Sequence, residues 1–418
     1  MPHRTEPTGS IQTPLGGRSS CKVPKHTIHN FKKTEQGHSM ISKTHITTVA
    51  ALAAALGAGS LTAQDQWLSE TSCSDVAHTI VNEGITAWGN VEHGRAKGMY
   101  QAALVVDPDC LAAKIALADM ANGSDWGTRS SQMAALADAS GTPSEMAWLE
   151  VMGASNGPNA AYEVAQNMPN DALFHYWGSW SESSESAIDG HMAFAERFPS
   201  LAGGSLNTLA YAYAQGDGVD TDEVKAREFL RSYLRVYNEA NAHDSFAEIS
   251  AIFGDYEGAI RHQQHAVDRG GATVYGERVG LYWRLSNKDE FTQSVVDAVE
   301  VLANPDAPEE ETAAVLSDQS VMCLSSMVPC AVMTAAEYMA TANNTEWLSM
   351  SANDIDVMFN DMMTYAVATH HNTGQYVLDG QTVDYSVRVS SVWEVTNQGV
   401  HLITANWAPM GGAGMPGS

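Results

Sequence analysis

The sequence predicts a mainly helical protein, in which an array of helical hairpins over residues 64–303 precedes a small α+β domain over residues 312–409. Three observations carry this prediction. Residues 241–271 read as two helices joined by a glycine turn, the acidic and proline-rich linker 304–311 (NPDAPEEE) separates two regions, and the last forty residues alternate in polarity. The chain has 418 residues, more than one compact core usually holds, so several domains or an extended array are expected.

The stretch around Gly254 defines the expected unit of the array. Phe246, Ile249 and Phe253 recur three and four residues apart, which predicts one apolar stripe of a helix. Gly254 then ends that helix, because glycine tolerates the left-handed dihedral angles of a helix end. The second helix carries the small Ala259 where a partner helix must come close. Neither helix can bury its apolar face alone, so neighbours of the same kind are required.

This unit resembles the tetratricopeptide repeat. The family's small, Gly-Asp-Tyr and Ala-Leu positions are matched by Ala247, Gly254, Asp255, Tyr256, Ala259, Ala266 and Val267. His243 stands where the family has a tryptophan in its first helix. A second repeat ending is carried by Ala103, Leu104, Asp107 and Pro108. The loop of the Sel-type variant is matched by Gly216, Gly218, Val219, Asp222, Lys225 and Ala226. The resemblance implies an alpha-solenoid whose first helices line a concave binding face.

The front of the chain has the form of an export signal. Residues 40–63 begin with a short basic segment, continue with an alanine-rich apolar stretch and end with small residues before Ala63. Cleavage is expected after Ala63, and no cysteine at the cut supports a lipid anchor. Residues 1–39 are expected to be disordered or to reflect a start codon chosen too far upstream. The sequence therefore predicts a periplasmic or secreted protein with no membrane span after cleavage.

The charge of the chain limits its partners. The formal net charge is −27, and residues 65–418 hold 15 basic against 47 acidic side chains. Such a surface repels phosphate backbones, which argues against nucleic-acid binding. Two interpretations stay open: solubility in a salty exterior, and attraction for cations or basic partners.

Four cysteines follow the expected cleavage site, and an even count in an exported chain indicates disulfides. The local pairing joins Cys73 to Cys110 and Cys323 to Cys330, although three connectivities are possible. Zinc binding does not fit the spacing, and plain buried thiols remain the alternative.

The sequence predicts no metal or other cofactor. The methionine-rich stretch from residue 312 to Met363 is predicted to be helical and lies close to His370 and His371. Thioether and imidazole groups suit copper, but methionines at helical intervals also suit an irregular core. His262 and His265 lie three apart on one helix face, and no third ligand is identifiable.

The C-terminal segment is predicted to form strands over residues 382–389, 391–395 and 400–407. It resembles the end of the ketosteroid-isomerase and nuclear-transport-factor-like cone fold, matched by Asp379, Gly380, Val392, Trp393, Gly399, Trp407 and Pro409. The resemblance implies an apolar cavity, for which the candidate lining residues are Tyr385, Arg388, Trp393, His401 and Trp407. Thr404 and Asn406 stand where many relatives carry histidines, so this strand offers no acid-base residue. Residues 410–418 are expected to form a flexible tail.

Two functions follow. The first is an exported scaffold that binds a peptide or protein on a concave face, where the resemblance places Asn207, Tyr211, Asp244 and Glu248. Asp244 and Glu248 lie one turn apart, which would favour a basic partner; the alternative is that they are solvated acids of a helix face. The second is small-molecule binding, or isomerase- or hydrolase-like activity, in the C-terminal cone. No catalytic residue is predicted for either.

Overall fold

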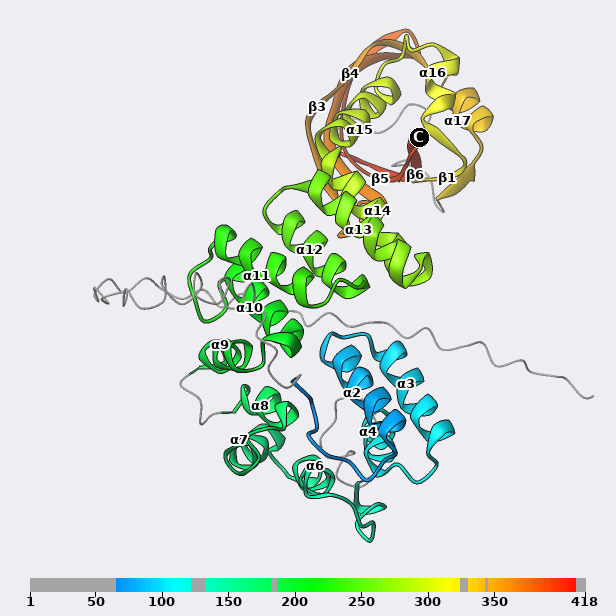
Figure 1. Cartoon of the computed structure of the whole chain (residues 1–418). Coiled ribbons are helices and arrows are strands. Elements are labelled where there is room, and N and C mark those ends of the chain that lie inside the picture. The colour runs from blue at the N-terminus through cyan, green and yellow to red at the C-terminus, as the bar shows by residue number, and fades with distance from the viewer. Residues whose placement is uncertain (1–64, 122–132, 182–185, 324–329, 343–344, 411–418) are drawn as a thin grey trace, which may run out of the picture. The chain divides into compact units, whose positions relative to one another are not determined.

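The computed structural model describes residues 65–121, 133–181, 186–323, 330–342 and 345–410 (Figure 1). The expected N-terminal segments, 1–39 and 40–63, lie outside these residues, as does the expected tail from residue 411. Among the residues described, no helix is both long and apolar enough to cross a membrane.

The first part of the chain is helical, and the described residues between 75 and 286 contain no strand. Its helices are α2 (Asp75–Gly89), α3 (His93–Val106), α4 (Leu111–Ala121), α6 (Pro143–Gly153), α7 (Gly157–Asn167), α8 (Ala172–Gly178), α9 (Ala187–Arg197), α10 (Gly203–Gln215), α11 (Glu223–Val236), α12 (Ala240–Ile252), α13 (Tyr256–Gly270) and α14 (Ala272–Ser286), with a short 3₁₀ turn at Pro199–Leu201. Chain neighbours such as α2 and α3, α10 and α11, and α12 and α13 pack side by side (Figure 1).

The turn, the helix cap and the small residues expected from the sequence explain why α12 and α13 form a hairpin. Gly254 has φ +78°, the left-handed conformation that lets the chain reverse. Asp255 caps α13, because its side chain accepts a hydrogen bond from the Gly258 amide at 2.9 Å. Ala247 and Ala259 are fully buried and pack with Tyr282 of α14. Their small side chains let three helices approach one another closely.

Contacts between distant segments supplement this neighbour-to-neighbour packing. Trp67, just before α2, is buried and packs its ring against Tyr176 and Phe194. At the other end of α2, a Cβ placed on Gly204 would lie 2.3 Å from the Gly89 carbonyl oxygen. The N-terminal hairpin therefore packs against α8, α9 and α10, so this region departs from an array in which each repeat touches only the next.

Both expected disulfides are confirmed. Cys73 is bonded to Cys110, and Cys323 is bonded to Cys330. The first bond fixes the segment before α2 to the residue that precedes α4, and the second links the last residue of β1 to the residue that precedes β2.

The C-terminal part is an α+β unit, as expected. Its elements are α15 (Lys288–Leu302), α16 (Glu309–Ala314), β1 (Leu316–Cys323), β2 (Ala331–Met333), α17 (Ala335–Ala342), β3 (Glu346–Phe359), β4 (Tyr365–Leu378), β5 (Gln381–Thr396) and β6 (Gly399–Pro409). The sheet order is β2-β1-β6-β5-β4-β3, with β1 parallel to β6 and the other neighbours antiparallel. The strands curve around α15 and α17, which contact the sheet from its concave side (Figure 1).

Two expectations about this part need correction or restatement. The helical prediction from residue 312 to Met363 is wrong over most of its length, because β1, β2 and β3 lie there. The expected linker 304–311 contains the start of α16, which begins at Glu309. The helix before that linker, α15, shares a core with the sheet through Phe291, Val295 and Val299. The domain boundary at the linker stays a prediction.

We expect Ala259→Arg to unfold the hairpin of α12 and α13. The position is fully buried, overpacking costs about 1 to 3 kcal/mol, and burial of a charge costs more. Thermal melting followed by circular dichroism measures the effect. Gln264→Arg, at an exposed position on the same helix, serves as the control and should change stability by less than about 0.5 kcal/mol. Equal melting temperatures for both variants would contradict the packing described for α13.

A second stability prediction concerns Gly84 of α2. A Cβ at this position would lie 2.5 Å from the ring of Tyr100, which is itself 2% exposed and cannot move aside freely. Gly84→Ala should therefore destabilise the protein by about 1 to 3 kcal/mol. Gly98→Ala, at an exposed position of α3 where a Cβ would meet nothing within 4 Å, should instead stabilise it by about 0.5 to 1 kcal/mol. Urea denaturation of both variants measures whether the free energy of unfolding falls for Gly84→Ala and rises for Gly98→Ala.

Candidate functional site

The four residues expected on the concave face lie on two helices, α10 and α12. Asn207 and Tyr211 lie one turn apart on α10, and Asp244 and Glu248 lie one turn apart on α12. Arg278, on α14, was not identified from the sequence. Hydrogen bonds connect all of these residues except Asn207, and we call the connected side chains of Tyr211, Asp244, Glu248, Gln263 and Arg278 the polar face.

The contacts of the polar face are short. The Tyr211 hydroxyl donates to Glu248 Oε2 at 2.9 Å. The guanidinium of Arg278 donates to Asp244 Oδ2 at 2.7 Å and to Glu248 Oε2 at 3.1 Å. The side-chain amide of Gln263, on α13, donates to Asp244 Oδ1 at 2.8 Å. Helices α10 and α14 are therefore both joined to carboxylates of α12, the first through the Tyr211 hydroxyl and the second through the Arg278 guanidinium.

The environment shifts the ionisation of these groups. Burial raises the pKa of Asp244, while Arg278 and Gln263 oppose the rise. Burial raises the pKa of Tyr211 well above its usual value, and the charge of Glu248 adds to it. Burial alone would lower the pKa of Arg278, but the charges of Asp244 and Glu248 raise it overall. The tyrosine is a neutral donor at neutral pH, and the guanidinium is charged.

Charge and accessibility decide what the polar face can bind. Two carboxylates share one guanidinium, which leaves an excess of one negative charge. The side chains of Arg278 and Glu248 are 42% and 38% exposed, whereas that of Asp244 is 14% exposed. The carboxamide oxygen of Asn207, one turn from Tyr211, is buried and has no hydrogen-bond partner among the described residues. An incoming basic group would therefore meet Glu248 first.

The C-terminal α+β unit contains only some of the expected lining residues. Tyr385, Trp393 and Trp407 are buried and belong to the core of the sheet. Arg388 is exposed between the buried Val387 and Val389, so it lies on the opposite face of β5. His401 of β6 likewise alternates with the buried Val400 and Leu402. Alternation along the two strands therefore removes Arg388 and His401 from the interior.

The interior of this unit holds a cavity of about 10 Å³. It is lined by Val299, Leu302, His370, Asn372, Val389, Ser391, Trp393, Leu402, Ala405 and Trp407. His370 Nδ1 lies 2.8 Å from the Asn372 carboxamide oxygen, and burial lowers the pKa of His370. The Trp393 indole donates to Ser391 Oγ at 2.9 Å. The cavity thus has polar groups, but its volume suits about one water molecule rather than a substrate.

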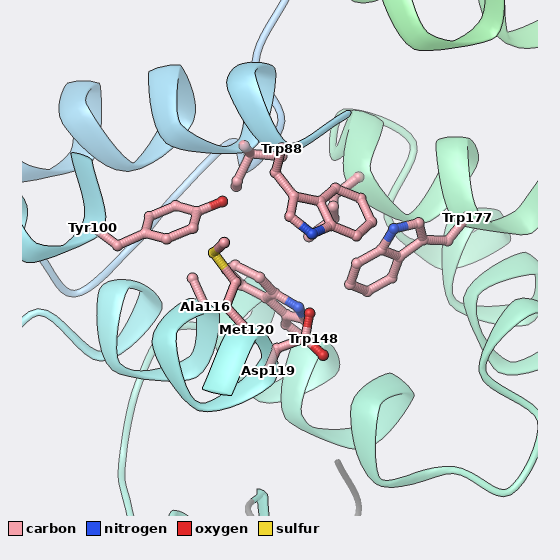
Figure 2. Close-up of a pocket in the computed structure, with 9 residues that line it drawn as sticks. Trp88, Tyr100, Ala116, Asp119, Met120, Trp148 and Trp177 are labelled. Atoms are coloured by element: carbon pink, nitrogen blue, oxygen red, sulfur yellow. The ribbon is translucent and has the colours of Figure 1, made fainter. Parts of the chain in front are cut away.

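A second small cavity lies among the helices of the N-terminal region (Figure 2). Trp88, Trp148 and Trp177 come from α2, α6 and α8 and turn toward one another, while Tyr100 and Asp119 line its other sides. The ring centroids of Trp88 and Trp177 are 5.6 Å apart, in an edge-to-face arrangement. The sequence did not bring these residues together, because they lie on separate helices. The volume of this cavity is also about 10 Å³, room for about one water molecule.

The structure adds a third histidine to His262 and His265. His243 of α12 places its Nδ1 atom 3.1 Å from Nδ1 of His262, and its ring centroid is 5.1 Å from that of His265. The ring of Phe246 stacks on that of His262, with their centroids 3.9 Å apart. We call His243, His262 and His265 the histidine cluster.

The chain matches no protein-family model and no curated protein. Solved structures similar to it include NTF2-like proteins. One, of unknown function, is from Prochlorococcus: it is 10% identical, the match covers 29% of this chain and 94% of that one, and the TM-score is 0.26. A second is from Cytophaga hutchinsonii, with 13% identity, coverage of 29% of this chain and 93% of that one, and a TM-score of 0.23. A third, with a cystatin-like fold, is from Novosphingobium aromaticivorans, with 13% identity, coverage of 31% of this chain and 87% of that one, and a TM-score of 0.26. At these TM-scores the matches carry no argument about the fold or the function of this chain.

The lowered pKa values in the histidine cluster predict that the free energy of unfolding falls in acid. Burial is the main cause that lowers the pKa of His243 and His262 to about 4, and the neighbouring charges of Arg269, Arg261 and His265 contribute. An unfolded histidine takes up a proton near pH 6.5, whereas these folded ones resist protonation until about pH 4. Their contribution to stability is therefore complete above pH 6.5 and is lost as the pH falls toward 4.

Urea denaturation at several pH values between 7 and 4 tests this prediction. The double variant His243→Gln, His262→Gln should lose part of the pH dependence. The other histidines whose pKa burial lowers retain the rest; they are His175 and His191, at about 4, and His93 and His370. His371→Gln, at an exposed position of the C-terminal unit, is the control and should keep the full dependence. A double variant with an unchanged pH dependence would contradict the prediction.

Proposed function

We propose that the helical region is an exported binding scaffold that holds a peptide or protein segment with a basic side chain on its polar face. One observation carries the proposal: Tyr211 of α10, Asp244 and Glu248 of α12 and Arg278 of α14 form one connected, partly exposed surface with an excess of one negative charge. First helices of tetratricopeptide-type and Sel-type solenoids line the binding face, which agrees with this arrangement.

The chemistry of the polar face favours a cationic partner. Asp244 and Glu248 each accept a hydrogen bond from Arg278, and a lysine or arginine of a partner could replace that contact at the more exposed Glu248. Charge-assisted hydrogen bonds of this type are stronger than neutral ones. The surrounding chain, with 47 acidic and 15 basic residues after residue 64, would attract such a partner over a longer range.

Export is the second part of the proposal. The two disulfides are typical of chains that fold in an oxidising compartment. The signal-like segment 40–63 and the strong acidity are compatible with a periplasmic or secreted location. Small-molecule binding or catalysis in the cone-like unit receives less support, because the cavity beside His370 has a volume of about 10 Å³.

Charge-neutral variants of the polar face provide the test. Lysine- and arginine-containing peptides are selected from a random display library on the full chain, and their dissociation constants are measured by fluorescence polarisation. We expect Glu248→Gln to weaken binding about fivefold, equivalent to about 1 kcal/mol, because it removes the exposed carboxylate. Arg278→Gln should strengthen binding, since it removes the internal competitor for both carboxylates.

Glu257→Gln is the matched control, because Glu257 is a solvent-exposed acid on α13 outside the polar face. It should leave the affinity nearly unchanged. Helical circular dichroism of each variant verifies that the fold is retained. Equal effects of Glu248→Gln and Glu257→Gln, or weaker binding by Arg278→Gln, would refute binding at this face.

A further inference from the structure

We propose that the histidine cluster is a binding site for a divalent transition metal of the Zn²⁺ class, with His243, His262 and His265 as its ligands. The site would bridge α12 and α13 and is separate from the polar face. The sequence alone showed two of the three ligands, and the fold of the hairpin supplies the third.

The first two ligands already have nearly the required spacing. Two imidazole nitrogens bound to one tetrahedral metal at about 2.05 Å lie about 3.3 Å from each other. The Nδ1 atoms of His243 and His262 are 3.1 Å apart. Phe246, stacked on His262, restricts the rotation of that ring. If the two nitrogens moved apart by about 0.2 Å, both could bind one metal ion.

The outer partner of His243 orients it as a ligand. Its Nε2 atom lies 2.8 Å from the carboxamide oxygen of Asn238, which can only accept a hydrogen bond. The proton of His243 is therefore on Nε2, and the lone pair is on Nδ1, facing His262. Metal-binding histidines commonly donate their second ring N–H to such an oxygen, which fixes the tautomer and the orientation of the ring.

His265 completes the set after a side-chain rotation. As the side chains stand, no three potential ligand groups of the described residues converge on one point. His265 is exposed, however, and its ring centroid is 5.1 Å from that of His243 and 6.4 Å from that of His262. Rotation about the side-chain bonds of an exposed histidine is inexpensive. The exposed side of the cluster leaves a fourth position for water.

The proton between the first two ligands has to move for metal binding. With the lone pair of His243 on Nδ1, the Nδ1 atom of His262 donates its proton across the 3.1 Å contact, and binding of a metal through this atom requires the proton to shift to Nε2 of the same ring. Arg269, Arg261 and Arg227 act against a positive charge near these rings, while Asp255 favours it. Arg227 is paired with Glu223 and Asp255, which reduces its effect.

The ligand type selects the metal. Three imidazoles suit Zn²⁺, Cu²⁺ and Ni²⁺, whereas Mg²⁺ and Ca²⁺ require oxygen ligands. Zinc tolerates three protein ligands and one water in a tetrahedral site. A bound ion would hold α12 and α13 in one register and raise the melting temperature of the helical region.

Isothermal titration of the full chain with Zn²⁺ tests the site. We expect one Zn²⁺ per chain, no heat with Mg²⁺, and a higher melting temperature in the presence of zinc. His265→Ala should weaken zinc binding at least about tenfold and leave the fold intact, because the side chain is exposed. Asn238→Ala should weaken it about 10- to 100-fold without removing a ligand.

His371→Ala is the control for adventitious binding, because it removes an exposed histidine of the C-terminal unit. It should leave the zinc affinity of the cluster unchanged. The absence of zinc binding by the wild-type chain would overturn the proposal. So would an affinity that His265→Ala and His371→Ala reduce equally, since that result indicates non-specific surface binding.

Discussion

Each helical hairpin can bury its apolar stripe only against another segment of the chain, and this constraint governs the helical region. Ala247 and Ala259 are fully buried because Tyr282 of the following helix covers them. The same close approach brings Arg278 of α14 within 2.7 Å of Asp244 on α12. The polar face is therefore a consequence of packing: small side chains in the core permit helices to come near enough for long polar side chains to meet at the surface.

The N-terminal half satisfies the constraint differently, because it joins segments that are distant in sequence. Glu145 is fully buried, and its carboxylate accepts hydrogen bonds from the backbone N–H groups of Ser72, Ala112 and Thr142 at 2.9 to 3.0 Å. The Cys73–Cys110 disulfide lies beside two of these residues. One side chain thus organises three segments, which should make this half unfold more cooperatively than an array coupled only between neighbours.

The sequence predicted those features that depend on local patterns. The stripe of Phe246 and Ile249, the turn at Gly254 and the local disulfides all agree with the structure. Strand β4 was not predicted, because the burial of its residues does not follow their hydrophobicity. Its buried positions include His370 and Asn372, while Tyr365 and Val367 face outward, the reverse of the usual alternation. His370 and Asn372, which lie on this strand, were therefore not identified as cavity-lining residues.

The third histidine of the cluster, His243, was not identified from the sequence for a different reason. Its position beside His262 and His265 depends on how α12 and α13 are aligned along each other. In an antiparallel hairpin, residues equally distant from the turn face each other. His243 and His265 each lie eleven residues from Gly254, and Phe246 and His262 each lie eight residues from it. The polar contact between Asp244 and Gln263 uses the adjacent residues of the same two helices. A shift of α12 along α13 would therefore disturb the histidine cluster and the polar face together, which couples the two sites through a single helix pair.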